Sequence, residues 1–200
     1  MRIPVRHRPT PAASERGMTL MELMIVISIL ATVMLIVTSV LLSTTRVQAR
    51  TVRRAAVQAD SRQTLSLMAN ELRQAGADPS IPPIGVVGVQ AADSVTIHVR
   101  ADLNGDGVIE TAEPSEDVTY HYDATQKALT RDPGTGAAVV LDHVTGMTLS
   151  YFDDANLPVT PLPLSATDCA RVHSIGLTIT CEDRDSQPLS LTTRITLRNM

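Results

Sequence analysis

The residues with the clearest chemical potential form an acidic segment, 102–113, which reads DLNGDGVIETAE. Oxygen-bearing side chains stand at its first, third, fifth, ninth and twelfth positions, and a glycine stands at the sixth, as in a twelve-residue calcium loop. The seventh residue would contribute its backbone carbonyl. The candidate ligands are Asp102, Asn104, Asp106, Val108, Glu110 and Glu113. Because four acids without a nearby base repel one another, this pattern predicts a structural Ca²⁺ site, with a weak affinity of about 10⁻⁴–10⁻³ M.

A solvated acidic turn is the alternative interpretation of the same segment. Asn-Gly and Asp-Gly pairs form tight turns without any metal. The flanking sequence indicates a strand before the loop and Pro114 after it, whereas an EF-hand has a helix on each side. An isolated calcium loop and a metal-free turn therefore both remain open.

No group of residues in the sequence indicates catalysis. The chain has no nucleophile elbow, phosphate-binding loop or dinucleotide fingerprint, and Gly134-Thr135-Gly136 is typical of a turn. The five histidines are scattered, without the spacing of a metalloprotease helix. A net charge of −4 and the lack of tryptophan argue against nucleic acid as the main partner. We expect a protein that is not an enzyme.

Two cysteines, Cys169 and Cys181, lie near the C-terminus. If this part of the chain is exported, the pair indicates a disulfide, because thiols outside the cytosol tend to oxidise. Two unrelated buried thiols are the alternative. Two cysteines alone do not complete a four-ligand zinc site.

A single carboxylate, Glu22, stands at the start of the longest apolar stretch of the chain. Leu23–Leu42 holds twenty residues without a charge or a proline. At about 1.5 Å per residue, a helix of this length spans roughly 30 Å, the thickness of the hydrocarbon core of a bilayer. An unpaired acid in such a helix costs about 2.5–3.5 kcal/mol in lipid, so a partner for Glu22 is expected.

The preceding segment, residues 1–17, has the features of a leader rather than of a folded element. It holds four arginines and three prolines and shows no apolar periodicity. A secretory signal would carry a shorter apolar region followed by a small-residue cleavage site, whereas here Gly17 precedes the apolar run. Cleavage after Gly17 would leave the cationic α-amino group of Met18 four residues from Glu22. That amine could neutralise Glu22 on the same chain or on a neighbouring one.

Residues 16–23, RGMTLMEL, resemble the prepilin signal of type IV pilins and type II secretion pseudopilins. In that family cleavage follows the glycine, the new N-terminus is methylated, and a glutamate at the fifth mature position guides assembly. The resemblance assigns processing to Gly17 and Met18, and assembly to Glu22. Met18 departs from the phenylalanine that is usual at its position. A plain signal anchor with a chance glutamate is the alternative.

The same resemblance implies partners and a location. The partners would be prepilin peptidase, the inner membrane, and other pilin or pseudopilin subunits contacted through the N-terminal helix. Arginines flank the apolar run on both sides, so charge alone does not orient the chain. The resemblance implies a single pass through a bacterial inner membrane, with an exported C-terminal domain that then enters a pilus or a periplasmic pseudopilus.

Helical periodicity continues beyond the apolar run. Leu65, Met68, Leu72 and Ala75 recur at spacings of three and four, which predicts a stripe that packs on a sheet. Gly76 and the prolines after it predict the end of the helix. We therefore expect a removed leader over 1–17, a long helix over 18–76 with its transmembrane and assembly segment over 18–42, and a β-rich exported domain over 77–200.

Alternating apolar and polar residues predict strands in the remainder of the chain. The fold class that follows is α+β: a long N-terminal helix packed on a mainly antiparallel sheet, which the resemblance extends to a pilin-like lollipop. The proline-rich stretch 157–164 is predicted to be a loop. The alternating sets are Val95, Ile97 and Val99; Val118, Tyr120 and Tyr122; Met147, Leu149 and Tyr151; Ile175, Leu177 and Ile179; and Leu189 to Leu197, with a shorter run at Ala137 to Leu141.

Three phrases narrow the resemblance within the family. They are ADLNGDG at 101–107, LSYFD at 149–153 and RITL at 194–197, which look most like W-type minor pilins and the J-type minor pseudopilin. This implies a minor type IV pilin that helps to initiate or cap the fibre. The alternatives are a minor pseudopilin of a type II secretion system and a signal-anchored, calcium-binding periplasmic module that does not polymerise.

Overall fold

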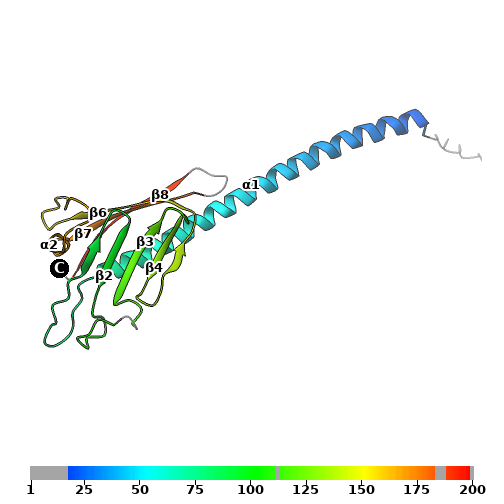
Figure 1. Cartoon of the computed structure of the whole chain (residues 1–200). Helices are drawn as coiled ribbons and strands as arrows, with labels where there is room; N and C mark the ends of the chain where they lie inside the picture. The colour runs from blue at the N-terminus through cyan, green and yellow to red at the C-terminus, as the bar shows by residue number, and fades with distance from the viewer. Residues whose placement is uncertain (1–17, 111–112, 183–187, 199–200) are drawn as a thin grey trace, which may run out of the picture. The chain divides into compact units, whose positions relative to one another are not determined.

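The structure, a computed structural model, describes residues 18–110, 113–182 and 188–198 (Figure 1). The chain divides into two compact units, residues 1–48 and 49–200. One helix, α1 (Leu20–Gln74), contributes its first part to the first unit and its second part to the other.

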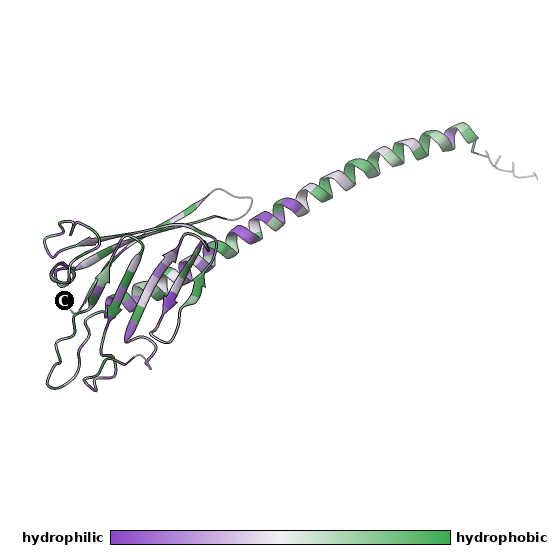
Figure 2. Ribbon diagram, in the orientation of Figure 1, coloured by the Kyte–Doolittle hydropathy of each residue, from purple (hydrophilic) through white to green (hydrophobic). Residues whose placement is uncertain are grey.

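The first part of α1 is apolar on all sides. Thr19 caps its start: its carbonyl accepts from the Leu23 N–H at 3.1 Å and its Oγ1 accepts from the Glu22 N–H at 3.2 Å. Figure 2 shows mainly hydrophobic colours over this part of the helix. Among the described residues, α1 is the one helix that is long and apolar enough to cross a membrane, and its most apolar window has no buried residue. This exposure is what a segment surrounded by lipid requires.

The second part of α1 is amphipathic. Met68, Leu72 and Ala75 are fully buried, so the predicted stripe does pack on the body. Thr64 and Ser61 extend the buried side by two further turns. The helix ends at Gln74, and Gly76 follows with a φ of 77°, the left-handed conformation that favours glycine after a helix.

Two antiparallel sheets form the body. The first has five strands in the order β1-β2-β3-β4-β5, and the second has three in the order β6-β7-β8. A short helix, α2 (Ala166–Cys169), precedes β7. The strands of the first sheet are β1 (Val89–Ala92), β2 (Thr96–Arg100), β3 (Asp117–Asp123), β4 (Ala128–Asp132) and β5 (Ala138–Leu141). Those of the second are β6 (Val144–Phe152), β7 (Ser174–Cys181) and β8 (Leu189–Thr196).

One core joins α1 to both sheets. Apolar side chains from the helix, from the inner faces of β2 and β3, and from β6 and β7 form a single buried cluster. Two backbone hydrogen bonds tie the sheets together: Leu149 donates to Ser94 at 2.8 Å, and Val144 donates to Lys127 at 2.9 Å. The α+β fold with a long N-terminal helix on antiparallel sheets is confirmed.

The body differs from the expectation in two respects. We expected one sheet, whereas the described residues form two. The alternation pattern also gave no sign of β1 and β4, which are only four and five residues long. The stretch 157–164 is a loop as predicted, apart from an isolated bridge between Phe152 and Pro158.

Candidate functional site

The predicted processing residues lie at the N-terminal end of the described chain. Gly17 falls outside the described residues, so the structure says nothing of the cleavage point. Met18 and Glu22 are both exposed. Because Thr19 caps the helix, a chain that began at Met18 would start one residue before the cap.

The Glu22 carboxylate has no ion-pair partner within residues 18–110, 113–182 and 188–198. The sequence offers no basic residue between Glu22 and Arg46. Any charge that neutralises Glu22 inside a bilayer must therefore come from the chain's own N-terminus or from another molecule.

The acidic loop is organised around Asp102, which is fully buried. Its Oδ1 accepts from the Gly105 N–H at 2.6 Å, and its Oδ2 accepts from the Gly107 N–H at 3.0 Å. Both glycines have φ near 80°, a conformation that side-chain-bearing residues rarely adopt. These bonds fold the loop tightly around one carboxylate.

The next two candidate ligands also engage the backbone. Asn104 Oδ1 accepts from the Asp106 N–H at 2.9 Å, and Asp106 Oδ1 accepts from the Val108 N–H at 2.8 Å. The Asn104 amide donates to Asp106 Oδ2 at 3.1 Å. Both side chains form Asx-type turns, in which a short polar side chain replaces a backbone acceptor.

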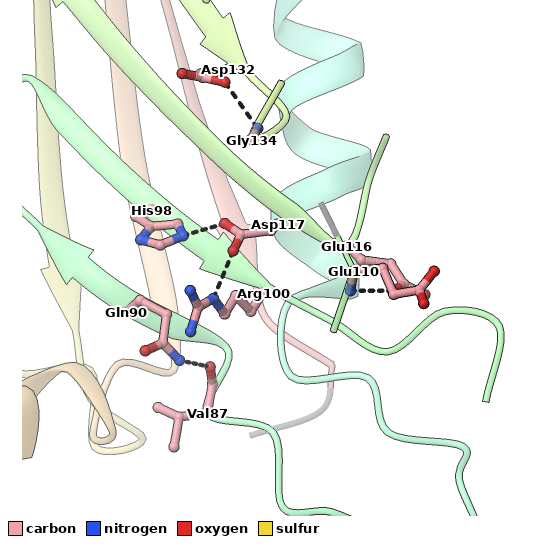
Figure 3. Close-up of polar contacts among 9 residues, drawn as sticks. All are labelled: Val87, Gln90, His98, Arg100, Glu110, Glu116, Asp117, Asp132 and Gly134. Carbon is pink, nitrogen blue, oxygen red and sulfur yellow. Dashed lines mark hydrogen bonds and ion pairs between the residues drawn. The ribbon is translucent and has the colours of Figure 1, made fainter. Parts of the chain in front are cut away.

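Glu116, which was not among the predicted ligands, accepts hydrogen bonds from backbone N–H groups of the loop. It is almost fully buried, and its Oε1 accepts from the Leu103 N–H at 2.9 Å and the Asn104 N–H at 3.3 Å. Its Oε2 accepts from the Glu110 N–H at 3.2 Å, a contact that Figure 3 shows. The only advance signal of its role was its acidity just past the predicted loop.

The candidate ligands are not brought together as a cation site. Among the described residues, no three acidic, histidine or cysteine side chains are grouped closely enough to hold a metal ion. Glu113 is exposed, whereas Glu116 occupies the interior of the loop. In this arrangement backbone N–H groups satisfy the carboxylates, so calcium binding remains a prediction.

A second buried polar group lies between α1 and the five-stranded sheet. Glu71 on α1 accepts from Arg131 on β4, with Nη2–Oε1 at 2.6 Å and Nε–Oε1 at 3.1 Å. The Tyr120 hydroxyl on β3 donates to Glu71 Oε2. Burial, and then the neighbouring carboxylate, raise the pKa of Tyr120. The hydrogen bonds that Arg131 donates to Glu71 raise the pKa of Arg131. This network fixes the helix on the sheet.

Polar residues on the outer face of the same sheet form a further contact. Asp117 on β3 lies between His98 and Arg100 on β2, as Figure 3 shows. The Arg100 Nε donates to Asp117 Oδ2 at 3.0 Å, and His98 Nε2 contacts Oδ1. No serine or cysteine takes part in these contacts. They link β2 to β3 across the outer face of the sheet.

The predicted disulfide is not present. Cys169 and Cys181 are both free and buried. Cys181 is the last residue of β7, whereas Cys169 lies in α2, before the first residue of that strand. Seven strand steps of about 3.3 Å separate the two ends of β7 by about 23 Å. Cys169 stays near the start of β7, because its carbonyl accepts from the Val172 N–H at 3.2 Å and His173 already pairs with Phe152. A disulfide requires Cα atoms within about 7 Å of each other, so the fold keeps the two thiols apart.

Comparisons with known families decide the superfamily. A family model described as prepilin peptidase-dependent protein B matches residues 50–198, which cover most of the β-rich body. The chain belongs to the prepilin peptidase-dependent protein B family. A second model, the prokaryotic N-terminal methylation motif, matches residues 13–38. A search among curated proteins gave no match.

These matches place the chain in the type IV pilin-like superfamily. The methylation motif spans the leader end, Gly17, Glu22 and most of the apolar run, as the resemblance of residues 16–23 predicted. Proteins of these families are structural subunits, so the chain is not an enzyme. The signal and the apolar helix are consistent with a membrane-anchored subunit that carries an exported domain.

Proposed function

We propose that this prepilin peptidase-dependent protein is a minor type IV pilin, which helps to initiate or cap the fibre. The observation that carries the proposal is the match to the methylation motif over residues 13–38, together with the match of residues 50–198 to a peptidase-dependent family. The peptidase removes residues 1–17 at the inner membrane, and the mature subunit then joins others through α1.

The mechanism rests on one ion pair that forms only after cleavage. Glu22 has no partner among the described residues, and an unpaired acid in lipid costs about 2.5–3.5 kcal/mol. The methylated amine of Met18 supplies the missing positive charge. When the amine of an incoming subunit pairs with Glu22 of its neighbour, entry into the fibre removes this cost. An uncleaved chain lacks that amine and stays outside.

Glu22→Ala and the isosteric Glu22→Gln test this mechanism in the native host. Both variants should be cleaved after Gly17 at the wild-type level but should be lost from sheared fibres. Thr19→Ala is the matched control, because it removes the helix cap and leaves the carboxylate in place. Normal incorporation of the Glu22 variants would contradict the pairing mechanism. Equal loss in Thr19→Ala would assign the effect to the start of the helix instead.

A minor pseudopilin of a type II secretion system is the second candidate. The phrases at 101–107, 149–153 and 194–197 support it, because they resemble the J-type minor pseudopilin as well as W-type minor pilins. The two assignments differ in the machine that requires the subunit. Deletion of the gene should abolish surface fibres in the first case and secretion of a folded exoprotein in the second. A signal-anchored module that never polymerises would alter neither.

We further propose that the acidic loop binds one Ca²⁺ ion with low affinity as a structural cofactor. Support comes from the ligand spacing of Asp102, Asn104 and Asp106, and from the positive φ of Gly107 at the sharp turn. The side-chain oxygens of Asn104 and Asp106 that accept backbone hydrogen bonds each have a second lone pair, which can ligate the ion. The cation would rigidify the loop rather than switch the fold.

A further inference from the structure

The sheets that the described residues form have four edge strands, and at three of these strands other segments of the chain cover part of the edge with hydrogen bonds. At the β6 edge, the Leu149 N–H donates to the Ser94 carbonyl at 2.8 Å, and the Tyr151 carbonyl accepts from the Val159 N–H at 2.9 Å. Both contacts come from segments outside the second sheet. Two outward groups of β6, the Leu149 N–H and the Tyr151 carbonyl, are therefore satisfied.

The edges of the first sheet are closed in the same way. At β1, the Ala92 carbonyl accepts from the Leu164 N–H at 2.9 Å. At β5, the Val140 carbonyl accepts from the Thr64 hydroxyl of α1 at 3.1 Å. Exposed edges invite pairing with other chains, and folds usually cover them in this manner.

β8 is the exception, and its register shows which of its groups are free. The Leu197 N–H donates to the His173 carbonyl at 3.0 Å, so odd-numbered residues of β8 pair with β7 and even-numbered ones turn away from it. Consistently, the Arg198 N–H reaches the Arg73 carbonyl on the other side, at 3.4 Å. Within the described part of the chain, no backbone hydrogen bond satisfies the outward groups of Ser190, Thr192, Arg194 and Thr196.

Burial along β8 shows where the edge is open. Ile195 and Leu197 are buried at its C-terminal end, but Leu189 and Leu191 are only half-buried. On the neighbouring strand, the partner of Leu191, Ile179, is fully buried. The core therefore reaches the N-terminal part of β8 without being covered there.

Features that normally protect an edge are lacking in β8. The strand has no proline, and its one charged residue is Arg194. The guanidinium of Arg194 bends back over its own sheet, where it donates to Ser174 at 2.8 Å, contacts Asn156, and stacks 4.0 Å from the Phe152 ring centroid. The charge is thus held away from the edge that it would otherwise block.

We propose that β8 is a docking edge that pairs with an extended strand of a neighbouring pilin-like subunit. The outward backbone N–H and C=O groups of Ser190, Thr192 and Arg194 present donors and acceptors in alternation along the strand. Only the backbone of another extended strand presents the complementary order. The added strand would place apolar side chains over Leu189 and Leu191 and small polar ones beside Ser190 and Thr192. The inference rests on the proposed function for the identity of its partner.

Photo-crosslinking in the host membrane tests the proposal with the full-length chain. Benzoylphenylalanine is placed at Thr192 on β8 or, as a matched control, at Thr148 on β6. The two residues share one cross-strand row and one exposed face, because both pair with Thr178. An edge partner lies about 5 Å from Thr192 and about 15 Å from Thr148. We expect crosslinks at Thr192 to a different subunit that carries its own prepilin signal, with few at Thr148.

Three crosslinking results would overturn the proposal. They are no crosslink at Thr192, equal yields at both positions, and a product that contains two copies of this chain. Glu22→Ala separates this test from that of the proposed function. If Glu22→Ala is excluded from fibres but Thr192 gives no crosslink, only the docking edge fails. If the leader is retained, the proposed function fails as well.

Proline substitution adds a second, independent readout. The Thr192 N–H points away from β7, so Thr192→Pro keeps the sheet intact and should unfold near the wild-type temperature. It should also lower the yield of a crosslink placed at Ser190 by about tenfold or more, because it removes a donor and a strand-compatible surface. Thr193→Pro removes an N–H that pairs with Leu177 and should destabilise the body. An undiminished crosslink in a folded Thr192→Pro variant would refute strand pairing.

Discussion

Glu71→Ala should destabilise the body more than any substitution of an exposed residue, because it leaves the buried Arg131 guanidinium without its counter-charge. Glu71 and Arg131 are 8% and 15% exposed at their side chains, so little water replaces the lost carboxylate. Removing one partner of a buried ion pair costs about 3–5 kcal/mol. For a domain of this size, each kcal/mol lowers the Tm by about 2–4 °C. The expected decrease in Tm is therefore about 6–20 °C.

Further variants measure how much each hydrogen bond and charge of this network contributes to stability. Tyr120→Phe removes one hydrogen bond to a charged acceptor and should cost about 1.5–3 kcal/mol. Arg131→Met in the Glu71→Ala background removes the stranded charge and should recover part of the stability. A double-mutant cycle then gives the coupling between the two residues, which we expect to be favourable and larger than 1 kcal/mol.

Thermal and urea unfolding of the soluble body, residues 44–200, followed by circular dichroism, provide the measurement. Glu182→Ala, which removes an exposed acid, is the control and should change stability by less than about 0.5 kcal/mol. A Glu71→Ala variant as stable as this control would refute the conclusion that the network fixes α1 on the sheet. A coupling near zero would refute the direct pairing of Glu71 with Arg131.

Three further predictions concern packing, thiols and calcium. Gly88→Ala should cost about 1–3 kcal/mol, measured by urea unfolding, because its Cβ would lie 2.6 Å from the Gly76 backbone nitrogen. Because Cys169 and Cys181 are free, dithiothreitol should leave the Tm unchanged. Burial raises the pKa of both thiols, so their alkylation in the native protein should be slow. Since the thiol pKa is higher in the folded than in the unfolded state, stability should fall as pH rises through the pKa range of free thiols. A Tm that falls on addition of reductant would instead support the predicted disulfide. Millimolar Ca²⁺ should raise the Tm of the wild type but not of Asp106→Ala; an unchanged wild type would refute the metal site.

The periodic spacing of apolar residues in the sequence predicted the helix and six of the eight strands that the described residues form, because the burial of these elements follows a regular period. Met68 and Leu72 lie on one helical face, and the strands with clear alternation have one buried side, as β6 and β7 show. β1 and β4 were missed for a physical reason. Both are short, and β4 carries Arg131, whose burial depends on a carboxylate 60 positions away.

The failures of prediction at the site share one cause. Sequence spacing shows how far apart two residues lie along the chain but not which element separates them. The expected export of this part of the chain favoured a disulfide between Cys169 and Cys181, but an argument from the compartment does not show that β7 separates the two thiols. Likewise, Glu116 and Glu71 look like ordinary acids, and only the fold places their carboxylates among buried donors. In contrast, Glu22 was identifiable because its anomaly is local, a charge beside an apolar run.

The N-terminus of the mature protein tests the central claim most directly. Intact mass and terminal sequencing of the chain purified from host membranes should give a first residue of N-methylated Met18, with Glu22 at the fifth position. A chain that still begins at Met1 and retains the arginine-bearing residues 1–17 would contradict the account, because the amine that pairs with Glu22 would not exist.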